Sequence, residues 1–177
     1  LGAKHAGAFD VSAACSGFLY GLMTGWQFVA TGMYETVLVV GVDCMSTITD
    51  YRDRNTCVLF GDAAGAVVLR PEPRQGELVY GFLRGDGSGS EFMNIPAGGS
   101  RRPPSHETVE QGLHYMTLKG NAVFKFAVDK MRELIEDALE RNGWSAGDVG
   151  LVIPHQVNTR IIEAAVRKLD IPMDRVF

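Results

Sequence analysis

The chain has 177 residues, of which 46% are hydrophobic and 21% are charged, so it is long enough and apolar enough to bury a substantial core. Its net charge of −4 argues against a nucleic-acid-binding protein, because the neutralisation of phosphates requires a concentrated basic surface. The three cysteines are an odd number, which indicates free thiols in a reducing compartment, and we expect a cytoplasmic protein. The cysteines and the four histidines show no zinc-ligand spacing, so no metal is expected.

The first predicted element lies in an uncharged stretch, residues 11–34, which is long enough to raise the question of a membrane span. Serine, threonine and glutamine recur within it and no basic flank is present, which favours a helix buried in a protein core and argues against membrane association. Gly17, Gly21 and Gly25 lie four residues apart and predict a ridge that lets another backbone approach the helix closely. Gly32 predicts the end of this helix.

The remaining predicted elements alternate between strands and helices. Apolar runs predict strands at 36–43, at 57–60 and 64–69 with a tight turn between them, from residue 77, and at 148–155. Helical periodicity predicts a long amphipathic helix that ends near 142–143 and a further helix over 161–169. A polar linker at 71–76 separates two halves, and residues 98–112 form a polar surface excursion. The alternation predicts an α/β fold with a largely parallel or mixed sheet.

Cys15 lies in the stretch FDVSAACSGF, where small residues lead into the first predicted helix. At the start of a helix, unpaired backbone N–H groups and the positive end of the helix dipole favour a thiolate, so the position suits a nucleophile. The alternative is a small buried hydrophobe, which is the commonest role of a free cysteine. Cys44 and Cys57 have no comparable setting and are expected to be structural.

His155 is the natural partner to seek for Cys15. It follows an apolar run through Pro154, and the polar Gln156 and Asn158 come next, so its ring is expected to project from a strand end into a cleft. A lone histidine is often structural instead. Asn158 also has a structural alternative, as the N-cap of the last helix.

Four longer motifs follow one another along the chain. They are DVSAACSGF around Cys15, LFGDAAGAVVL at 59–69, LKGNAVFKFAV at 118–128 and VIPHQVNTRII at 152–162. In this order they resemble β-ketoacyl-acyl carrier protein synthase III, a condensing enzyme of the thiolase fold. The resemblance implies α/β/α/β/α layers with mixed five-stranded sheets, incomplete at both ends. Residues 1–72 would be the later part of the N-terminal thiolase-like half, and residues 73–177 the first part of the C-terminal half.

One family motif has no counterpart in this chain. The third catalytic residue of the family is an asparagine in a GNTSAAS-like motif, which the resemblance places after Phe177. The glycine-rich C-terminal motif that supplies an oxyanion-hole N–H is missing as well. The resemblance therefore implies an internal piece of a longer subunit.

The resemblance implies a two-stage reaction that initiates fatty acid synthesis without a cofactor. An acyl-CoA primer is loaded on Cys15, and decarboxylative condensation with malonyl-acyl carrier protein then gives 3-oxoacyl-acyl carrier protein and carbon dioxide. His155 and the missing asparagine would bind the developing enolate oxygen.

The resemblance also assigns binding residues and partners. Contacts with CoA or phosphopantetheine are expected from Arg54, Gly120, Phe124 and Asn158, and docking of the acyl carrier protein from Lys125 and Arg160. For Arg54 the alternative is a solvated surface charge. Because the family is homodimeric, a homodimer is expected.

Two other classes of function remain open at this point. An initiating polyketide-type synthase or another acyltransferase would use the same Cys-His-Asn site. In a non-catalytic α/β binding module, Cys15 and His155 would be core residues. Such a module does not need the catalytic asparagine, so its absence fits this alternative.

Overall fold

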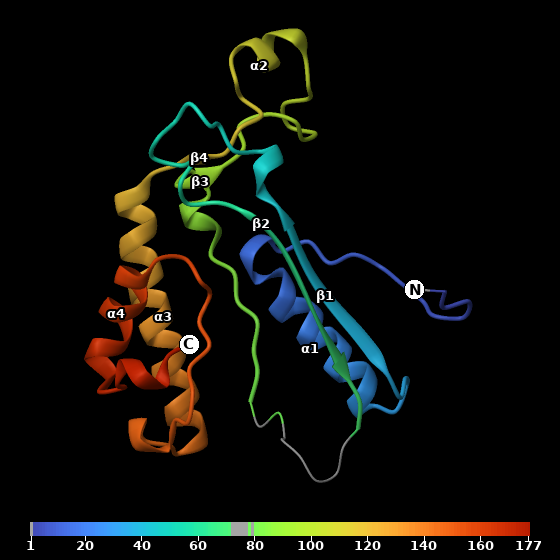
Figure 1. The fold of residues 1–177 in the computed structure, drawn as a ribbon, viewed down its shortest axis with the longest axis vertical. Helices are drawn as coiled ribbons and strands as arrows, with labels where there is room; N and C mark the ends of the chain where they lie inside the picture. The colour runs from blue at the N-terminus through green and yellow to red at the C-terminus, as the bar shows by residue number, and fades with distance from the viewer. Residues whose placement is uncertain (1, 72–77, 79) are drawn as a thin grey trace. The chain divides into compact units, whose positions relative to one another are not determined.

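The computed structural model describes residues 2–71, 78 and 80–177 (Figure 1). The chain forms two compact units, one of residues 1–43 and 63–84 and the other of residues 44–62 and 85–177. We call them the cysteine unit and the histidine unit, after Cys15 and His155. The predicted boundary between thiolase-like halves, at residue 72, does not coincide with the division into these two units and stays a prediction. Most of the predicted linker at 71–76 lies outside the described residues.

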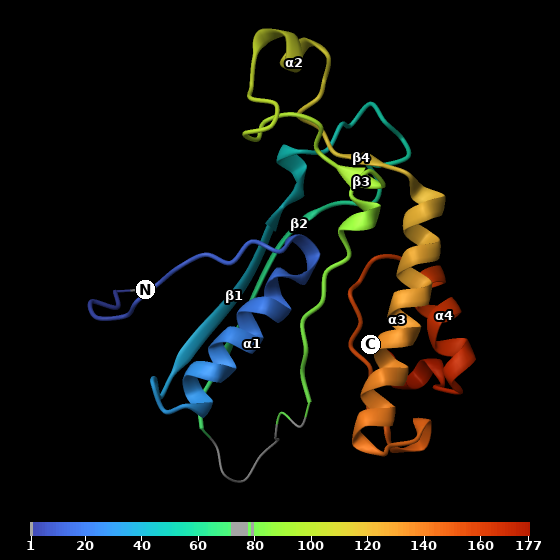
Figure 2. The ribbon, with the colours of Figure 1, turned by 180° about the vertical axis from the view of Figure 1, so that it is seen from behind.

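The cysteine unit consists of one long helix on a two-stranded sheet. Helix α1 (Gly17–Ala30) follows a 3-10 turn at Ala14–Ser16, and strand β1 (Val37–Cys44) pairs with β2 (Asp62–Leu69). Figures 1 and 2 show the two strands running in opposite directions with α1 lying along them. The helix ends where predicted, because Gly32 adopts the left-handed φ of +71° just beyond it.

The predicted glycine ridge is the surface by which α1 meets the sheet. A Cβ atom on Gly25 would lie 3.0 Å from Val37 Cγ1 and 3.1 Å from both Leu69 Cδ1 and Val39 Cγ2. A Cβ atom on Gly21 would lie 3.2 Å from Val39 Cγ1. Helix and sheet therefore approach too closely for a side chain at these two positions.

Replacement of Gly25 by alanine is expected to destabilise the protein. Alanine favours a helix over glycine by about 1 kcal/mol, but overpacking against three methyl groups costs about 1–3 kcal/mol. The matched control is Gly17→Ala, because a Cβ atom there would meet only the Val11 carbonyl oxygen, at 3.9 Å. Denaturant titration should rank Gly25→Ala below Gly17→Ala in free energy of unfolding, and the reverse order would contradict the close packing.

The histidine unit is built around the packing of two helices. Helix α3 (Gly120–Asn142) lies beside α4 (Thr159–Val166), as both ribbon views show. The buried side chains of α4 and of the segment that follows it are apolar: Ile161, Ile162, Ala165, Val166 and Ile171. Helix α3 ends as predicted, at Gly143 with a φ of +65°.

A small antiparallel pair of strands carries the polar excursion of this unit. Strand β3 (Met93–Asn94) pairs with β4 (Thr117–Leu118), and the intervening chain contains the short helix α2 (His106–Glu110). Ser105 caps α2, since its hydroxyl accepts from the Thr108 N–H and the Thr108 hydroxyl accepts from the Ser105 N–H. The sequence predicted an irregular surface segment here and missed this helix. The pattern that indicates the helix is Ser105 three residues before Thr108, because the two hydroxyls cap its first turn.

The predicted strand at 57–60 and its tight turn into 64–69 are wrong. The backbone N–H groups of Thr56 and Cys57 both donate to the Asp53 carbonyl, so residues 51–59 form turns. Strand β2 then begins at Asp62, whose carboxylate accepts from the Ser46 N–H at 2.8 Å and from the Ser46 hydroxyl at 2.6 Å. These hydrogen bonds lower the pKa of Asp62 and tie the start of β2 to Ser46, which is a structural role.

Of two other predicted strands, one lies partly outside the described residues and the other is reduced. Residues 77 and 79 lie outside the described residues, and residues 80–86 contain no strand. The predicted strand at 148–155 is reduced to a single parallel bridge between Val152 and Val176. No helix in the described part of the chain combines the length and the apolarity of a membrane-spanning segment.

Candidate active site

Cys15 lies on a sharp turn directly before α1. It is the middle residue of the 3-10 turn, which the Ser16 N–H closes by donating to the Ala13 carbonyl at 3.1 Å. The preceding Ala14 has a φ of +46°, a left-handed conformation that is uncommon for a residue with a side chain and costs on the order of 1 kcal/mol. The chain thus turns abruptly at Cys15, and the α-helix itself begins two residues later, at Gly17.

The predicted lowering of the Cys15 pKa is wrong. Although the residue as a whole is exposed, enclosure of its thiol by neighbouring atoms is the main cause that raises the pKa. The Asp43 carboxylate raises the pKa further, and only the hydrogen bond with the residue's own backbone N–H lowers it. The thiol form of Cys15 is therefore favoured, because burial and the negative charge of Asp43 outweigh the backbone hydrogen bond.

His155 lies at the end of an extended segment in the histidine unit. The side chain is exposed, and the His155 carbonyl accepts a hydrogen bond from the Val157 N–H at 2.9 Å. The neighbouring Gln156 amide donates to the Phe177 carbonyl at 2.9 Å, which holds this segment beside the last residues of the chain. The predicted strand before His155 is thus a single bridge at Val152, and the projection of the ring into a cleft stays a prediction.

Asn158 is the N-cap of α4. Its side-chain oxygen accepts from the Arg160 N–H at 2.9 Å, so the structural alternative for this residue is confirmed. Within the described residues its amide nitrogen donates to no protein group, and capping therefore leaves that donor for a ligand. Arg160 is exposed in the first turn of the same helix.

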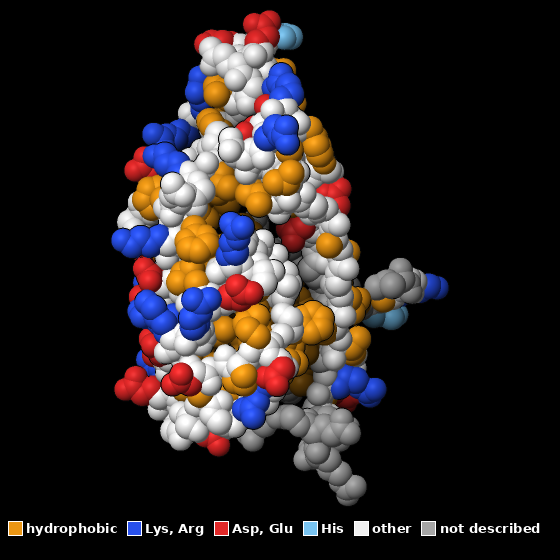
Figure 3. All heavy atoms as spheres, turned by 60° about the vertical axis from the view of Figure 1, so that its left-hand side comes forward, with side chains coloured by type: hydrophobic (Ala, Val, Ile, Leu, Met, Phe, Trp, Pro, Cys, Tyr) orange, Lys and Arg blue, Asp and Glu red, His pale blue; other side chains and the backbone are white. Residues whose placement is uncertain are grey.

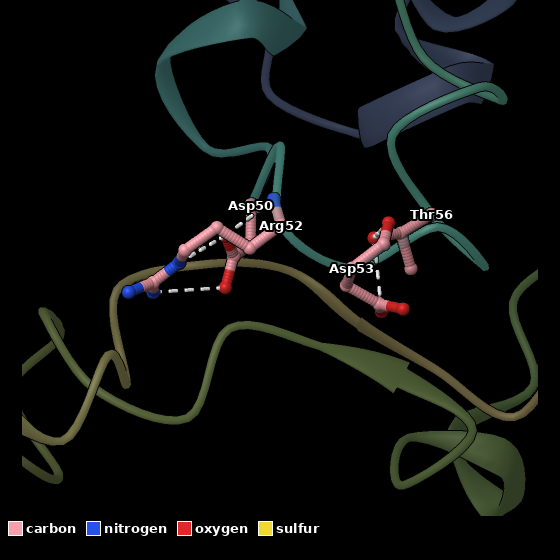
Figure 4. Close-up of polar contacts among 4 residues, drawn as sticks. All are labelled: Asp50, Arg52, Asp53 and Thr56. Atoms are coloured by element: carbon pink, nitrogen blue, oxygen red, sulfur yellow. Dashed lines mark hydrogen bonds and ion pairs between the residues drawn. The ribbon is translucent and has the colours of Figure 1, made fainter.

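Arg54 lies in a turn region, and side chains on either side of it along the chain hydrogen-bond one another. Figure 4 shows these four neighbours. On one side, the Arg52 guanidinium donates two hydrogen bonds to the Asp50 carboxylate, at 2.9 and 3.0 Å. On the other side, the Asp53 carboxylate accepts from the Thr56 hydroxyl at 3.1 Å. The Arg54 guanidinium itself is exposed and makes no hydrogen bond or ion pair within the described residues, so a cation is held on an ordered turn.

The remaining predicted site residues lie in the first turns of α3. Gly120 begins the helix, and a Cβ atom there would meet no atom within 4 Å. The Phe124 side chain is 39% exposed, and Lys125 is exposed beside it. These residues belong to the histidine unit with Arg54, His155, Asn158 and Arg160, whereas Cys15 belongs to the cysteine unit.

A shallow hollow in the cysteine unit was not foreseen from the sequence. Phe18 of α1, Gly41 and Asp43 of β1 and residues 63–67 of β2 line it. From the sequence, Asp43 is only the last residue of the strand predicted at 36–43. Among the described residues no group of three or more histidine, cysteine, aspartate or glutamate side chains is arranged to hold a metal ion.

Comparison with known sequences decides the family. The sequence model of 3-oxoacyl-[acyl-carrier-protein] synthase III matches residues 9–89, and the model of the C-terminal part of the same enzyme matches residues 139–177. The two matches together span more than half of the chain and contain Cys15 and His155. The chain belongs to the synthase III family.

Individual relatives agree with this assignment. The chain is 56% identical over 179 residues to the β-ketoacyl-[acyl-carrier-protein] synthase III of Solibacter usitatus, with 99% of this chain and 54% of the relative covered. The chain spans about half the length of the curated relatives that it matches.

Solved structures of the family have the same fold. The Aquifex aeolicus 3-oxoacyl-[acyl-carrier-protein] synthase III matches with a TM-score of 0.85 at 39% identity, over 98% of this chain and 52% of that one. The priming β-ketosynthase of the R1128 polyketide pathway matches with a TM-score of 0.80 at 35% identity, over 99% of this chain and 51% of that one. The thiolase-like fold class is thereby confirmed, and each sheet in the described residues contains two of its strands.

Proposed function

We propose that this protein initiates fatty acid synthesis as a β-ketoacyl-acyl carrier protein synthase III. The observation that carries the proposal is Cys15 on its strained turn at the start of α1, within a segment that the family model matches. In the first stage the Cys15 sulfur attacks the thioester carbon of an acyl-CoA, the bond from that carbon to the CoA sulfur breaks, and CoA leaves with the thiol proton. The product of this stage is an acyl thioester on Cys15.

The thiol form of Cys15 constrains how this first stage proceeds. Because burial and Asp43 raise the thiol pKa, the proton must leave as the sulfur attacks. The Ser16 and Gly17 N–H groups donate to the Ala13 and Ala14 carbonyls. The Cys15 N–H is therefore the backbone donor at hand for the negative oxygen of the tetrahedral intermediate.

The second stage uses the histidine unit. Malonyl-acyl carrier protein loses carbon dioxide, and the resulting carbanion attacks the acyl thioester to give 3-oxoacyl-acyl carrier protein and free Cys15. His155 would donate a hydrogen bond from Nε2 to the enolate oxygen, for which a neutral ring suffices. The family's asparagine would be the second donor.

The remaining predicted site residues support binding of the two donors. Arg54 would contact the nucleotide end of CoA, because its guanidinium is exposed and has no protein partner within the described residues. Gly120, Phe124 and the free amide of Asn158 would line the phosphopantetheine path.

Docking of the acyl carrier protein would use exposed cations on α3 and α4. Lys125 and Arg160 are exposed on the first turns of α3 and α4. Figure 3 shows lysine and arginine side chains interspersed with aspartate and glutamate. Such a surface favours a specific acidic partner over a polyanion such as nucleic acid. A homodimer and a cytoplasmic location complete the proposal.

The test is to supply the naturally made subunit with a panel of acyl-CoAs and malonyl-acyl carrier protein. We expect one carbon dioxide and one free CoA for each 3-oxoacyl-acyl carrier protein formed, with a rate that depends on the primer. Release of CoA without any 3-oxoacyl product would contradict a condensing enzyme and indicate an acyltransferase with another acceptor.

A second candidate function is priming of a polyketide pathway, which the 35% identical priming β-ketosynthase favours. The two functions share the chemistry and differ in the carrier protein. Competition between malonyl-loaded carriers of the two pathways in one reaction separates them, because each function predicts a preference for its own carrier.

A further inference from the structure

The register of α1 on β1 places an acidic side chain opposite the candidate nucleophile. Towards the N-terminus of the helix, Gly25 meets Val37 and Val39, Gly21 meets Val39, and Phe18 meets Gly41. Each turn of the helix thus corresponds to a step of about two residues along the strand. Because alternate strand residues share a face, the next residue on the helix-facing side of β1 is residue 43.

The next position along the helix is the turn that contains Cys15. One helical turn before Phe18 lies the 3-10 turn Ala14–Ser16, so Asp43 continues the contact series toward it. The hollow beside the helix gives independent support, because Phe18, Gly41 and Asp43 line the same concave surface. Two geometric observations therefore bring the Asp43 carboxylate to the Cys15 end of α1.

We propose that Asp43 is a positioning residue that controls the reactivity of Cys15, by holding the resting sulfur in its protonated form until the acyl donor binds. This inference rests on the proposed nucleophilic role of Cys15. A carboxylate facing a thiol disfavours the thiolate by charge repulsion, so the resting cysteine is protected from electrophiles and oxidants that react with thiolates. Asp43 acts through Cys15 and need not touch the substrate.

Among the charged residues of the cysteine unit, Arg84 lies on the segment whose carbonyl accepts from the Tyr20 hydroxyl of α1, and Asp43 is the one that continues the contact series toward Cys15. Within the cysteine unit α1 carries no charged residue, β1 carries Asp43 alone, and β2 carries none after Asp62. The Asp62 carboxylate is committed to Ser46, and Asp10 lies on the segment that leads to Cys15. Asp43 makes no hydrogen bond or ion pair within the described residues, and its charge contributes to the raised pKa of the Cys15 thiol.

The test is the pH dependence of Cys15 alkylation in the Asp43→Asn variant of the naturally made subunit. Iodoacetamide is the probe, and peptide-resolved mass spectrometry separates Cys15 from Cys44 and Cys57. Because the thiolate is the reacting form, loss of the negative charge should move the profile to lower pH and raise the rate at pH 7 by about threefold or more. A profile that superimposes on the wild type, or that moves to higher pH, overturns the proposal.

Two controls separate charge from disturbance of the fold. Asp43→Glu keeps the charge and should keep the wild-type profile, and Asp10→Asn removes a nearby charge on another segment and should leave the profile unchanged. If Asp43→Asn does not fold, raised salt should move the wild-type profile in the same direction, because ions screen an exposed carboxylate, and no salt effect would contradict the proposal.

Alkylation needs neither acyl-CoA nor carrier protein. A protein that fails to condense can therefore still show the effect of Asp43, and an active condensing enzyme can lack it. The outcome for Asp43 and the outcome for the proposed function are thus separately measurable.

Discussion

Replacement of Cys15 by serine is expected to lower formation of 3-oxoacyl-acyl carrier protein by on the order of 10⁴-fold or more, which is typical when a catalytic nucleophile is lost. A serine hydroxyl is a much weaker nucleophile than a cysteine sulfur unless a neighbouring base activates it. The measurement is steady-state product formation with saturating acyl-CoA.

The controls are the other two cysteines. Cys44 is the exposed last residue of β1 and Cys57 is half-buried in the turn region, and neither lies at the start of an α-helix. Cys44→Ser and Cys57→Ser should each retain activity close to the wild type. A Cys15→Ser variant that turns over at a wild-type rate, or a Cys44→Ser variant that does not, would contradict the assignment of the nucleophile.

Replacement of His155 by alanine is expected to separate the two stages of the reaction. Condensation should fall by about 10²–10³-fold, the typical cost of losing one hydrogen-bond donor to a developing oxyanion. Acylation of Cys15 should continue, because the Cys15 backbone N–H, the proposed donor to the oxyanion of that stage, does not depend on His155. Rapid-quench mass measurement of the acyl-enzyme and assay of carbon dioxide release follow the two stages independently.

The matched control for His155→Ala is His106→Ala. His106 is also exposed, and it begins the short helix α2, so its removal should change neither stage. Equal loss of acylation and condensation in His155→Ala would mean that the histidine activates the sulfur instead. No loss of either stage would make it a structural residue.

The elements that were predicted well are those specified by neighbouring residues. The glycine ridge follows from spacing alone. The end of α1 before Gly32, the end of α3 at Gly143 and the Asn158 cap of α4 follow from local helix signals. Such features require no knowledge of which segments meet in the folded chain.

The predictions that failed depend on long-range contacts. The apolar run at 57–60 resembles a strand, but the Asp53 carbonyl draws the preceding backbone into turns. The segment at 148–155 needs partner strands, and its bridge partner Val176 comes more than twenty residues later.

The candidate site shows the same division. The sequence identified Cys15 and His155 from their local settings, but the pKa of Cys15 depends on its enclosure and on Asp43, which is 28 residues away along the chain. A helix start alone predicts the opposite direction. Only the register of α1 on β1 reveals which charge the sulfur meets.

The most direct test of this account is to incubate the naturally made subunit with acyl-CoA in the absence of a malonyl donor and to map the acylated peptide. The account predicts one acyl group for each subunit, on Cys15, released when malonyl-acyl carrier protein is added. An unmodified Cys15, or an acyl group on Cys44 or Cys57, would contradict it.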